Sequence, residues 1–497
     1  MGVIKRQSIK ESVVAYIGVI IGALSVLFIQ PYFLSPQEIG LIKILIAFAS
    51  ILTPFILLGT GPVAIKYFPK FNSIENRDFG FISFLLLLPL VGFVILLTTF
   101  FTFQESVIQW YSSSKENLYI TKYLAYGLPL AFCLAYMTLL QAISKSLLKI
   151  TVPSILQNIW VRIGVILAII LYSIDWLSLS GLILLIISTY AIAVLAMLVY
   201  IKKLGHLFIK PQKDFFKNNR FKEILRFGSF IIFIGLSHTL VNYVDILMVG
   251  ALKGESKAGI YTIALFIGTV IEIPRRSLFS ISTPLIARAF HANDTKQIEY
   301  LYKSVSINLL IVGCLLLIGI WVNIDNLYSI MPNGEIYKSG KYVVLFIGLS
   351  KLFNMVTSLN GEIIVNSPHY RFILVALIFL AALTIVTNLY FIPRFDIVGA
   401  AIASLITLVF FNFSKLIFIY YKLMIHPFTA NTFKVIGIAV IVYCINLAMP
   451  TLPNPFIDIV LRSLLVGGLY IGLIVATHVS TDFNNIVKTV WQQVIKS

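Results

Sequence analysis

The segment VIEIPRRSLF, which begins at residue 270, contains one acid, two bases and a proline within a long apolar run. A charged side chain at bilayer depth costs at least about 2.5 kcal/mol on insertion scales, so these groups are expected to face something other than lipid. In a helix, Glu272 lies one turn from both Arg275 and Arg276, so it can pair with one base and leave one positive charge over. Pro274 removes a backbone donor, which predicts a kink.

Two interpretations of this cluster stay open. In the first, Glu272 and one arginine form an ion pair that stabilises a helix bundle, and the other arginine extends to the lipid headgroups. In the second, Arg275 and Arg276 line a cavity and bind a diphosphate. The second is chemically apt because a guanidinium donates paired hydrogen bonds to phosphate oxygens and stays charged at any working pH.

Other charged residues also lie within apolar stretches. Arg162 and Lys351 are deep enough in theirs to be further contacts of the diphosphate. Asp245 and Glu362, together with Glu272, are assigned to cation coupling or to charge pairing. Long basic side chains near helix ends usually reach the headgroups, so four are expected to be interfacial anchors: Lys43, Lys415, Lys434 and Arg462.

Four amides complete the set of polar candidates. Within a cavity they would hydrogen-bond sugar hydroxyls, whereas interhelical hydrogen bonds are the alternative role for such residues. They are Asn242, Asn354, Asn360 and Gln141.

The elements that carry these residues follow from composition. Of 497 residues, 59% are hydrophobic and only 12% are charged, which excludes an ordinary soluble domain. Apolar windows of about 19 residues recur fourteen times between residues 13 and 476. Lipid offers the backbone no hydrogen-bond partner, so these windows must be helices. We predict an all-α polytopic membrane protein with about 14 transmembrane helices.

The basic residues are distributed unevenly between the loops. With the N-terminus in the cytoplasm, the inside loops and tails hold 23 Lys and Arg, the outside loops hold seven, and eight fall within spans. This bias predicts that both termini are cytoplasmic. The net charge of +18 therefore indicates membrane topology and not a nucleic-acid partner. The segment 202–226 has the largest share of basic residues and is expected to lie on anionic headgroups.

Internal similarity at a shift of about 220 residues predicts a repeat of six helices. Gly18 corresponds to Gly235 and Gly40 to Gly259. An even number of helices gives both halves the same orientation, so they are expected to enclose a central chamber and to alternate its access. The predicted regions are 1–200 (first lobe), 201–226 (basic linker), 227–422 (second lobe) and 423–497 (two extra helices and a cytoplasmic tail).

Enzymatic and metal chemistry have little support in the sequence. The three cysteines lie far apart and inside apolar spans, which argues against disulfides or a zinc site. No P-loop, HExxH or GxSxG motif is present. We expect no enzyme activity and no cofactor, with energy coming from a proton or sodium gradient or from synthesis on one side and removal on the other.

Several longer stretches resemble a known family. They are LSPQEIGLIKI, NYVDILMVGALKGESKAGIYTIA, TPLIARAFHANDTKQIEYLYKSVS, NGEIIVNSPHYR, and VGAAIASLI followed by HPF. The chain is similar over its whole length to the polysaccharide-biosynthesis branch of the multidrug/oligosaccharidyl-lipid/polysaccharide exporter superfamily, which contains the O-antigen and lipid-linked oligosaccharide flippases. The resemblance implies twelve core helices in two lobes plus two extra helices. It also implies transfer of an undecaprenyl-diphosphate-linked glycan to the outer leaflet of a bacterial inner membrane.

Three alternatives differ from this expectation. A multidrug or cation exporter would need an acidic cavity, whereas the twelve core spans contain six basic residues and three acidic ones. A flippase for the peptidoglycan precursor resembles relatives that carry arginine in the first span, but residues 15–30 contain no charge. A membrane-bound O-antigen polymerase or ligase would present convergent acids or bases in a long outer loop. Such enzymes are instead expected as partners, alongside the bilayer and the polyprenyl-diphosphate-linked glycan itself.

Overall fold

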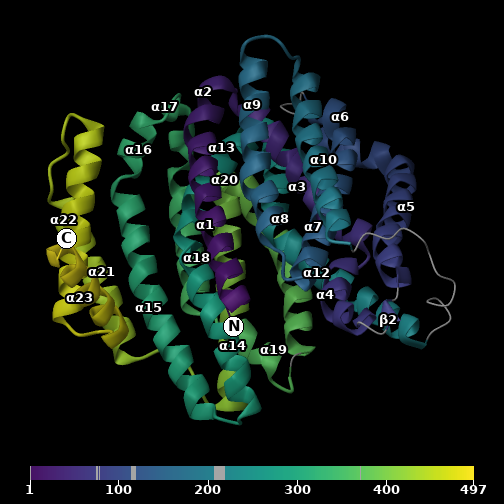
Figure 1. The fold of residues 1–497 in the computed structure, drawn as a ribbon. Helices are drawn as coiled ribbons and strands as arrows, with labels where there is room; N and C mark the ends of the chain where they lie inside the picture. Colours follow the sequence, from purple (N-terminus) through teal and green to yellow (C-terminus); the bar gives the residue numbers. More distant parts are fainter. Residues whose placement is uncertain are drawn as a thin grey trace. The chain divides into compact units, whose positions relative to one another are not determined.

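The computed structural model describes residues 2–73, 76–77, 79–112, 119–205, 219–369 and 371–496, and this part of the chain is almost entirely helical (Figure 1). Contacts between residues group the chain into two compact units, residues 1–262 and residues 263–497. The expected all-α membrane fold is confirmed. The one exception among the described residues is a two-stranded hairpin, β1 (Asn72–Ser73) with β2 (Asn76–Arg77).

In the first unit, α3 packs against α7 and α12, and α10 packs against α7 and α9. Two π-helical turns interrupt its helices, at Ser25–Ile29 and Leu156–Trp160, and a 3₁₀ turn precedes α7 at Leu124–Tyr126. The helices are α1 (Gly2–Leu24), α2 (Gln30–Phe33), α3 (Pro36–Leu57), α4 (Thr60–Phe71), α5 (Phe79–Ser112), α6 (Ile120–Tyr123), α7 (Gly127–Ser146), α8 (Thr151–Ile155), α9 (Val161–Ser173), α10 (Leu179–Lys203), α12 (Asn219–Lys253) and the start of α13 (Glu255–Thr269).

The start of α3 shows how local sequence sets a helix boundary. Ser35 is the N-cap: its hydroxyl accepts the backbone N–H of Glu38 at 3.3 Å, and the Glu38 carboxylate accepts the backbone N–H of Ser35 at 2.8 Å. Pro36 occupies the first helical position, where its missing N–H costs nothing. The helix ends at Leu58 and Gly59, both of which have left-handed backbone conformations.

Two glycines that the repeat predicts to be equivalent, Gly40 in α3 and Gly259 in α13, lie in direct contact. A Cβ atom on Gly40 would be 1.8 Å from the carbonyl oxygen of Glu255, and one on Gly259 would be 2.0 Å from that of Pro36. Each glycine thus allows the other helix to approach, and any side chain would force the backbones apart. The Glu255 carboxylate also accepts the backbone N–H groups of Tyr119, at 2.8 Å, and of the next residue.

In the second unit, α15 packs against α18, α21 and α22, and α18 packs against α20. Figure 1 shows the hairpin α21–α22 beside α15. Two 3₁₀ turns, Val270–Glu272 and Lys338–Gly340, link helices end to end. The helices are the end of α13, α14 (Arg275–His291), α15 (Thr295–Val322), α16 (Ile324–Ile330), α17 (Gly334–Tyr337), α18 (Lys341–Val356), α19 (Asn360–Asn366), α20 (Arg371–Leu423), α21 (Ala430–Leu447), α22 (Pro455–Ala476) and α23 (Thr481–Lys496).

Within the described residues, twelve helices or helix runs are long and apolar enough to cross a membrane. Two features reconcile this number with the expected fourteen spans. The 53-residue α20 joins two helices across a non-helical kink at Phe395 and Asp396. The predicted span around Pro274 is divided between α13 and α14, and neither part alone is 18 residues long.

The two compact units do not coincide with the two predicted lobes. Residues 227–262, which belong to the predicted second lobe, lie in the first unit, where α12 packs against α3. This grouping says which residues pack together and not which segments move together, so the predicted lobes stay a prediction. In the basic linker 201–226, residues 206–218 lie outside the described residues.

Candidate functional site

The helix interruption predicted at Pro274 is confirmed. The chain forms a 3₁₀ turn over Val270–Glu272, and α14 begins at Arg275. Pro274 has no N–H and so cannot continue the hydrogen-bond ladder of α13. The break places Glu272 and Arg275 on either side of an irregular turn, where their side chains meet.

The Glu272 carboxylate is the centre of a polar network. It forms an ion pair with Arg275 Nη1, and its Oε2 lies 3.3 Å from Lys351 Nζ. Asn354 Nδ2 donates to Oε1 at 2.7 Å. Three donors from two helices therefore converge on one carboxylate, whose side chain is 21% exposed. Glu272 pairs with Arg275 and not with Arg276.

Three further residues support the network from α15, α19 and α20. Asn412 Nδ2 donates to Asn354 Oδ1 at 3.2 Å, and Asn360 Nδ2 donates to the backbone carbonyl of Asn412 at 3.1 Å. The Tyr302 hydroxyl donates to Asn360 Oδ1. Because Asn360 and Asn412 are completely buried, they hold Asn354 in place from the protein interior.

Positive charge exceeds negative charge around this network. Arg276 is exposed, and Lys415 is only 7% exposed, with its Nζ 4.0 Å from the centre of the Phe411 ring. Both Lys415 and the half-buried Glu362 lie within electrostatic range of Arg275. The cluster thus contains four basic residues and two acidic ones. Within the described residues, Arg275 Nε is buried and donates to no acceptor.

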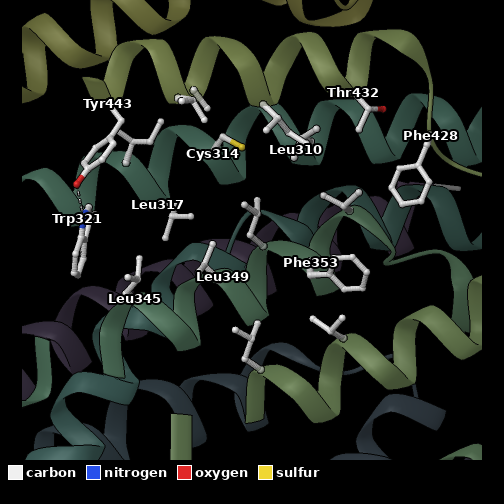
Figure 2. Close-up of a pocket in the computed structure, with 18 residues that line it drawn as sticks. Leu310, Cys314, Leu317, Trp321, Leu345, Leu349, Phe353, Phe428, Thr432 and Tyr443 are labelled. Carbon is white, nitrogen blue, oxygen red and sulfur yellow. Dashed lines mark hydrogen bonds between the residues drawn. The ribbon is translucent and has the colours of Figure 1, made fainter. Parts of the chain in front are cut away.

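A large apolar pocket of about 750 Å³ lies in the same unit. Figure 2 shows side chains pointing into it from α15, α18 and α21. At one end Trp321 Nε1 donates to the Tyr443 hydroxyl at 3.3 Å, and Phe428 and Thr432 lie at the other end (Figure 2). The remaining lining residues are almost all aliphatic or aromatic, and they include Leu310, Leu317, Leu345, Leu349, Phe353, Leu405 and Val409.

Helix α18 separates the polar network from the apolar pocket. Leu345, Leu349 and Phe353 line the pocket, whereas Lys351 and Asn354 lie about 200° and 140° around the helix from Leu349, given 3.6 residues per turn. On α20, Val409 lines the pocket and Asn412, one turn later, belongs to the network. A ligand with an anionic head and an apolar chain would match this pairing of surfaces.

In the first unit, Arg162 binds backbone. Its Nη1 donates to the carbonyl oxygen of Gly18, and a Cβ atom on Gly22 would lie 1.8 Å from the same nitrogen. Lys43 lies within electrostatic range of Arg162. The structure therefore brings Arg275, Lys351, Glu272, Asn354 and Asn360 together in one unit and places Arg162 in the other.

The other predicted site residues are bonded locally. Asp245 is buried and accepts the Tyr261 hydroxyl at 3.2 Å, and Asn242 donates to the carbonyl of His238 in its own helix at 2.7 Å. Gln141 donates to Gln157. Of the two amides, Gln141 thus bonds a residue of another helical segment, and Asn242 bonds one of its own helix.

Two expectations for interfacial anchors are wrong. Lys415 is buried against Phe411. Arg462 is 5% exposed and donates to Asp458, to Asn446 Oδ1 at 3.0 Å and to the carbonyl of Pro450 at 2.9 Å. Hydropathy and position along a helix do not fix which face of the helix turns inward, and the expectation therefore fails for both residues.

Sequence reasoning also missed Tyr302, Asn412 and the apolar pocket. Asn412 stands in the run VFFNFSK, where an amide three residues before a lysine in an otherwise apolar helix was an available signal. Tyr302 is one of many tyrosines and carried no such signal. The pocket is a space that apolar side chains leave unfilled, and no residue type in the sequence indicates such a space.

Comparisons with known proteins agree with the fold. The family model described as Polysaccharide biosynthesis protein matches residues 7–290, and the one described as MatE matches residues 231–390. An uncharacterized membrane protein of Methanocaldococcus jannaschii is 23% identical over 403 residues, which are 76% of this chain and 89% of that protein.

Two solved structures share the architecture. The lipid II flippase MurJ in its inward closed conformation has a TM-score of 0.78 and 14% identity, covering 95% of this chain and 99% of its own. An inward-facing multidrug resistance transporter of the MATE family has a TM-score of 0.61 and 13% identity, covering 82% and 94%. At such identities the likeness shows the fold alone. Since the first family model covers more than half of the sequence, the chain belongs to the polysaccharide biosynthesis protein family and is a membrane transporter of the multidrug/oligosaccharidyl-lipid/polysaccharide exporter superfamily.

Proposed function

We propose that this transporter is a flippase that moves a polyprenyl-diphosphate-linked oligosaccharide from the cytoplasmic to the outer leaflet, for synthesis of a surface polysaccharide. One observation carries the proposal: α18 and α20 bear an electropositive network and, on an adjoining surface, the wall of an apolar pocket of about 750 Å³. A diphosphate joined to a polyprenyl chain has an anionic head that fits the network and an apolar chain that fits the pocket.

The charge of the network supports an anionic head. Arg275, Arg276, Lys351 and Lys415 outnumber Glu272 and Glu362, so the cluster attracts phosphate and repels a cationic drug. Arginine is well suited to this role because its planar fork of donors fits phosphate oxygens. We assign the direct diphosphate contacts to Arg275, Arg276 and Lys351. Arg162, which belongs to the first unit, is proposed separately as a contact of the anionic substrate.

The pocket supports a long apolar tail. Between membrane helices a chain gains little from the hydrophobic effect, so its binding depends on van der Waals contact and shape. Branched aliphatic walls such as those formed by Leu310, Leu317 and Leu349 suit the methyl-branched polyprenyl chain. We assign the pocket to the part of the tail nearest the diphosphate.

Reconstitution tests the proposal directly. The purified full chain is placed in proteoliposomes with a fluorescent polyprenyl-diphosphate disaccharide, and transfer between leaflets is followed with a membrane-impermeant quencher. We expect transfer to fall at least tenfold in Arg275→Ala and further in the double variant with Arg276→Ala. Arg394→Ala is the matched control, because Arg394 stacks on Tyr390 of its own helix, with its guanidinium 3.7 Å from the ring centre, and should leave transfer unchanged.

Substrate arms in the same assay separate the alternatives. Lipid II tests the peptidoglycan-precursor role, which the MurJ-like fold suggests and the uncharged first span disfavours. Ethidium tests a multidrug role. Transfer of either one in preference to the polyprenyl-diphosphate disaccharide would overturn the proposal, as would full activity of the double arginine variant. A proton or sodium gradient imposed across the vesicles tests coupling.

A further inference from the structure

We infer that the Glu272 carboxylate is an internal ligand of the anion site, which the substrate diphosphate must displace. The inference rests on the proposed function and concerns its regulation. Three donors suited to phosphate are directed at this one acid: Arg275 Nη1, Lys351 Nζ and Asn354 Nδ2.

The network is incompletely satisfied in a way that favours exchange. The Arg275 guanidinium uses Nη1 for Glu272, while its Nε is buried and donates to no acceptor among the described residues. A buried donor without an acceptor costs free energy that a better-fitting ligand recovers. A carboxylate tethered three residues away occupies one side of the guanidinium fork, whereas a diphosphate has enough oxygens to use both sides.

The backbone around Glu272 also suits a group that must move. Glu272 ends a 3₁₀ turn directly before the break at Pro274, so no regular helix holds it on its C-terminal side. Its side chain is 21% exposed, so the protein does not fully enclose it. Asn354, by contrast, stays fixed because Asn412 holds its other end. Displacement would therefore remove the acid and leave the donors in position.

A competing carboxylate and a carboxylate that only orients its neighbours predict opposite changes in anion affinity when Glu272 is neutralised. If Glu272 competes with the substrate, neutralising it frees the donors and tightens anion binding. If Glu272 only orients Arg275 and Lys351, neutralising it disorders them and weakens binding. A competitor also speeds release, so the neutral variant should bind more tightly and yet transport more slowly.

The test uses the purified full chain in detergent, with inorganic pyrophosphate as the probe and calorimetry as the readout. We expect Glu272→Gln to lower the dissociation constant at least tenfold. Glu335→Gln is the matched control: it removes the same charge from an exposed ion pair with Lys338, outside the network, and should leave the constant unchanged. Weaker or unchanged binding in Glu272→Gln, or equal tightening in both variants, would overturn the inference.

A second variant covers the case in which Glu272→Gln fails to fold. In Glu272→Asp the shorter side chain withdraws from Lys351 and Asn354 but keeps its charge, so an intermediate tightening of pyrophosphate binding is expected. Unchanged binding in this variant would contradict the inference. The transfer assay separates the two proposals. Tightening by Glu272→Gln without transfer of any polyprenyl diphosphate would refute the proposed function alone. Loss of transfer in Arg275→Ala without tightening in Glu272→Gln would refute the internal ligand alone.

Discussion

Two arginine–carboxylate pairs in the second unit look alike in the sequence and differ in their surroundings. Arg462 pairs with Asp458 four residues earlier, and Arg275 pairs with Glu272 three residues earlier. In the first pair the side chains are 6% and 2% exposed, whereas in the second they are 27% and 21% exposed. Spacing and residue type therefore do not distinguish them, but burial does.

The Arg462–Asp458 pair is nearly saturated, which means that most donors and acceptors of its two side chains already have hydrogen-bond partners. Arg462 also donates to Asn446 and Pro450, while Asp458 accepts the amide of Asn326 at 2.6 Å and a backbone N–H at 3.2 Å. The Arg275–Glu272 pair instead has additional positive charge beside it and a free Nε donor. A pair whose donors and acceptors are all used has none left for a ligand, so we expect Arg462 to have a structural role and, under the proposed function, Arg275 to bind.

The largest effect is expected from breaking the saturated pair. Arg462→Ala leaves Asp458 as a buried, unpaired charge, which should lower the free energy of unfolding by about 3 to 5 kcal/mol. Thermal unfolding of the purified protein in detergent measures this loss. Replacing both residues with leucine should restore most of the stability. If Arg462→Ala unfolds like the unmodified protein, the structural assignment is wrong.

The unsaturated pair should show the opposite pattern. Arg275→Ala leaves Glu272 paired with Lys351 and Asn354, so the unfolding temperature should change little. Pyrophosphate binding should weaken at least tenfold, or about 1.4 kcal/mol. Calorimetry and thermal unfolding on one preparation give both values. A large loss of stability without a change in binding would erase the distinction between the pairs.

Arg162 allows a third, smaller test through its glycine neighbour. Gly22→Ala places a Cβ atom 1.8 Å from Arg162 Nη1, which must then leave the carbonyl of Gly18. The displaced group is the flexible end of a side chain, and alanine favours the helix, so stability should be nearly unchanged. Transfer should fall roughly fivefold, or about 1 kcal/mol in activation free energy. Gly437→Ala, which meets open space, is the control; an equal loss there would dismiss Arg162 as the cause.

The smallest effect is expected on the apolar side of α18. Leu349→Trp partly fills the pocket and should weaken binding of a polyprenyl diphosphate by roughly threefold, or about 0.6 kcal/mol, without changing that of pyrophosphate. Leu184→Trp, at a half-exposed position in the first unit, controls for the added bulk. If both ligands weaken equally, the pocket and the network are not separate subsites.

The helices, the break at Pro274 and the pairing of Glu272 with a nearby arginine could be predicted because each depends on local spacing. The burial of Lys415 and Arg462 could not, since the rotation of a helix about its axis is set by packing against distant segments. Asn354, Asn360 and Asn412 were visible as polar residues, but their mutual bonds join positions more than 50 residues apart. The pocket depends on how side chains fail to fill space, which composition does not encode.

The contact between Gly40 and Gly259 has an evolutionary consequence. Each glycine is needed because the partner helix is close, so a side chain at one position opens the gap and ends the requirement at the other. The stability effects of replacing the two glycines are therefore not additive, and the second replacement costs much less than the first. Among relatives of this chain, natural selection should therefore act on the two positions together, and we expect both glycines to be kept together or lost together.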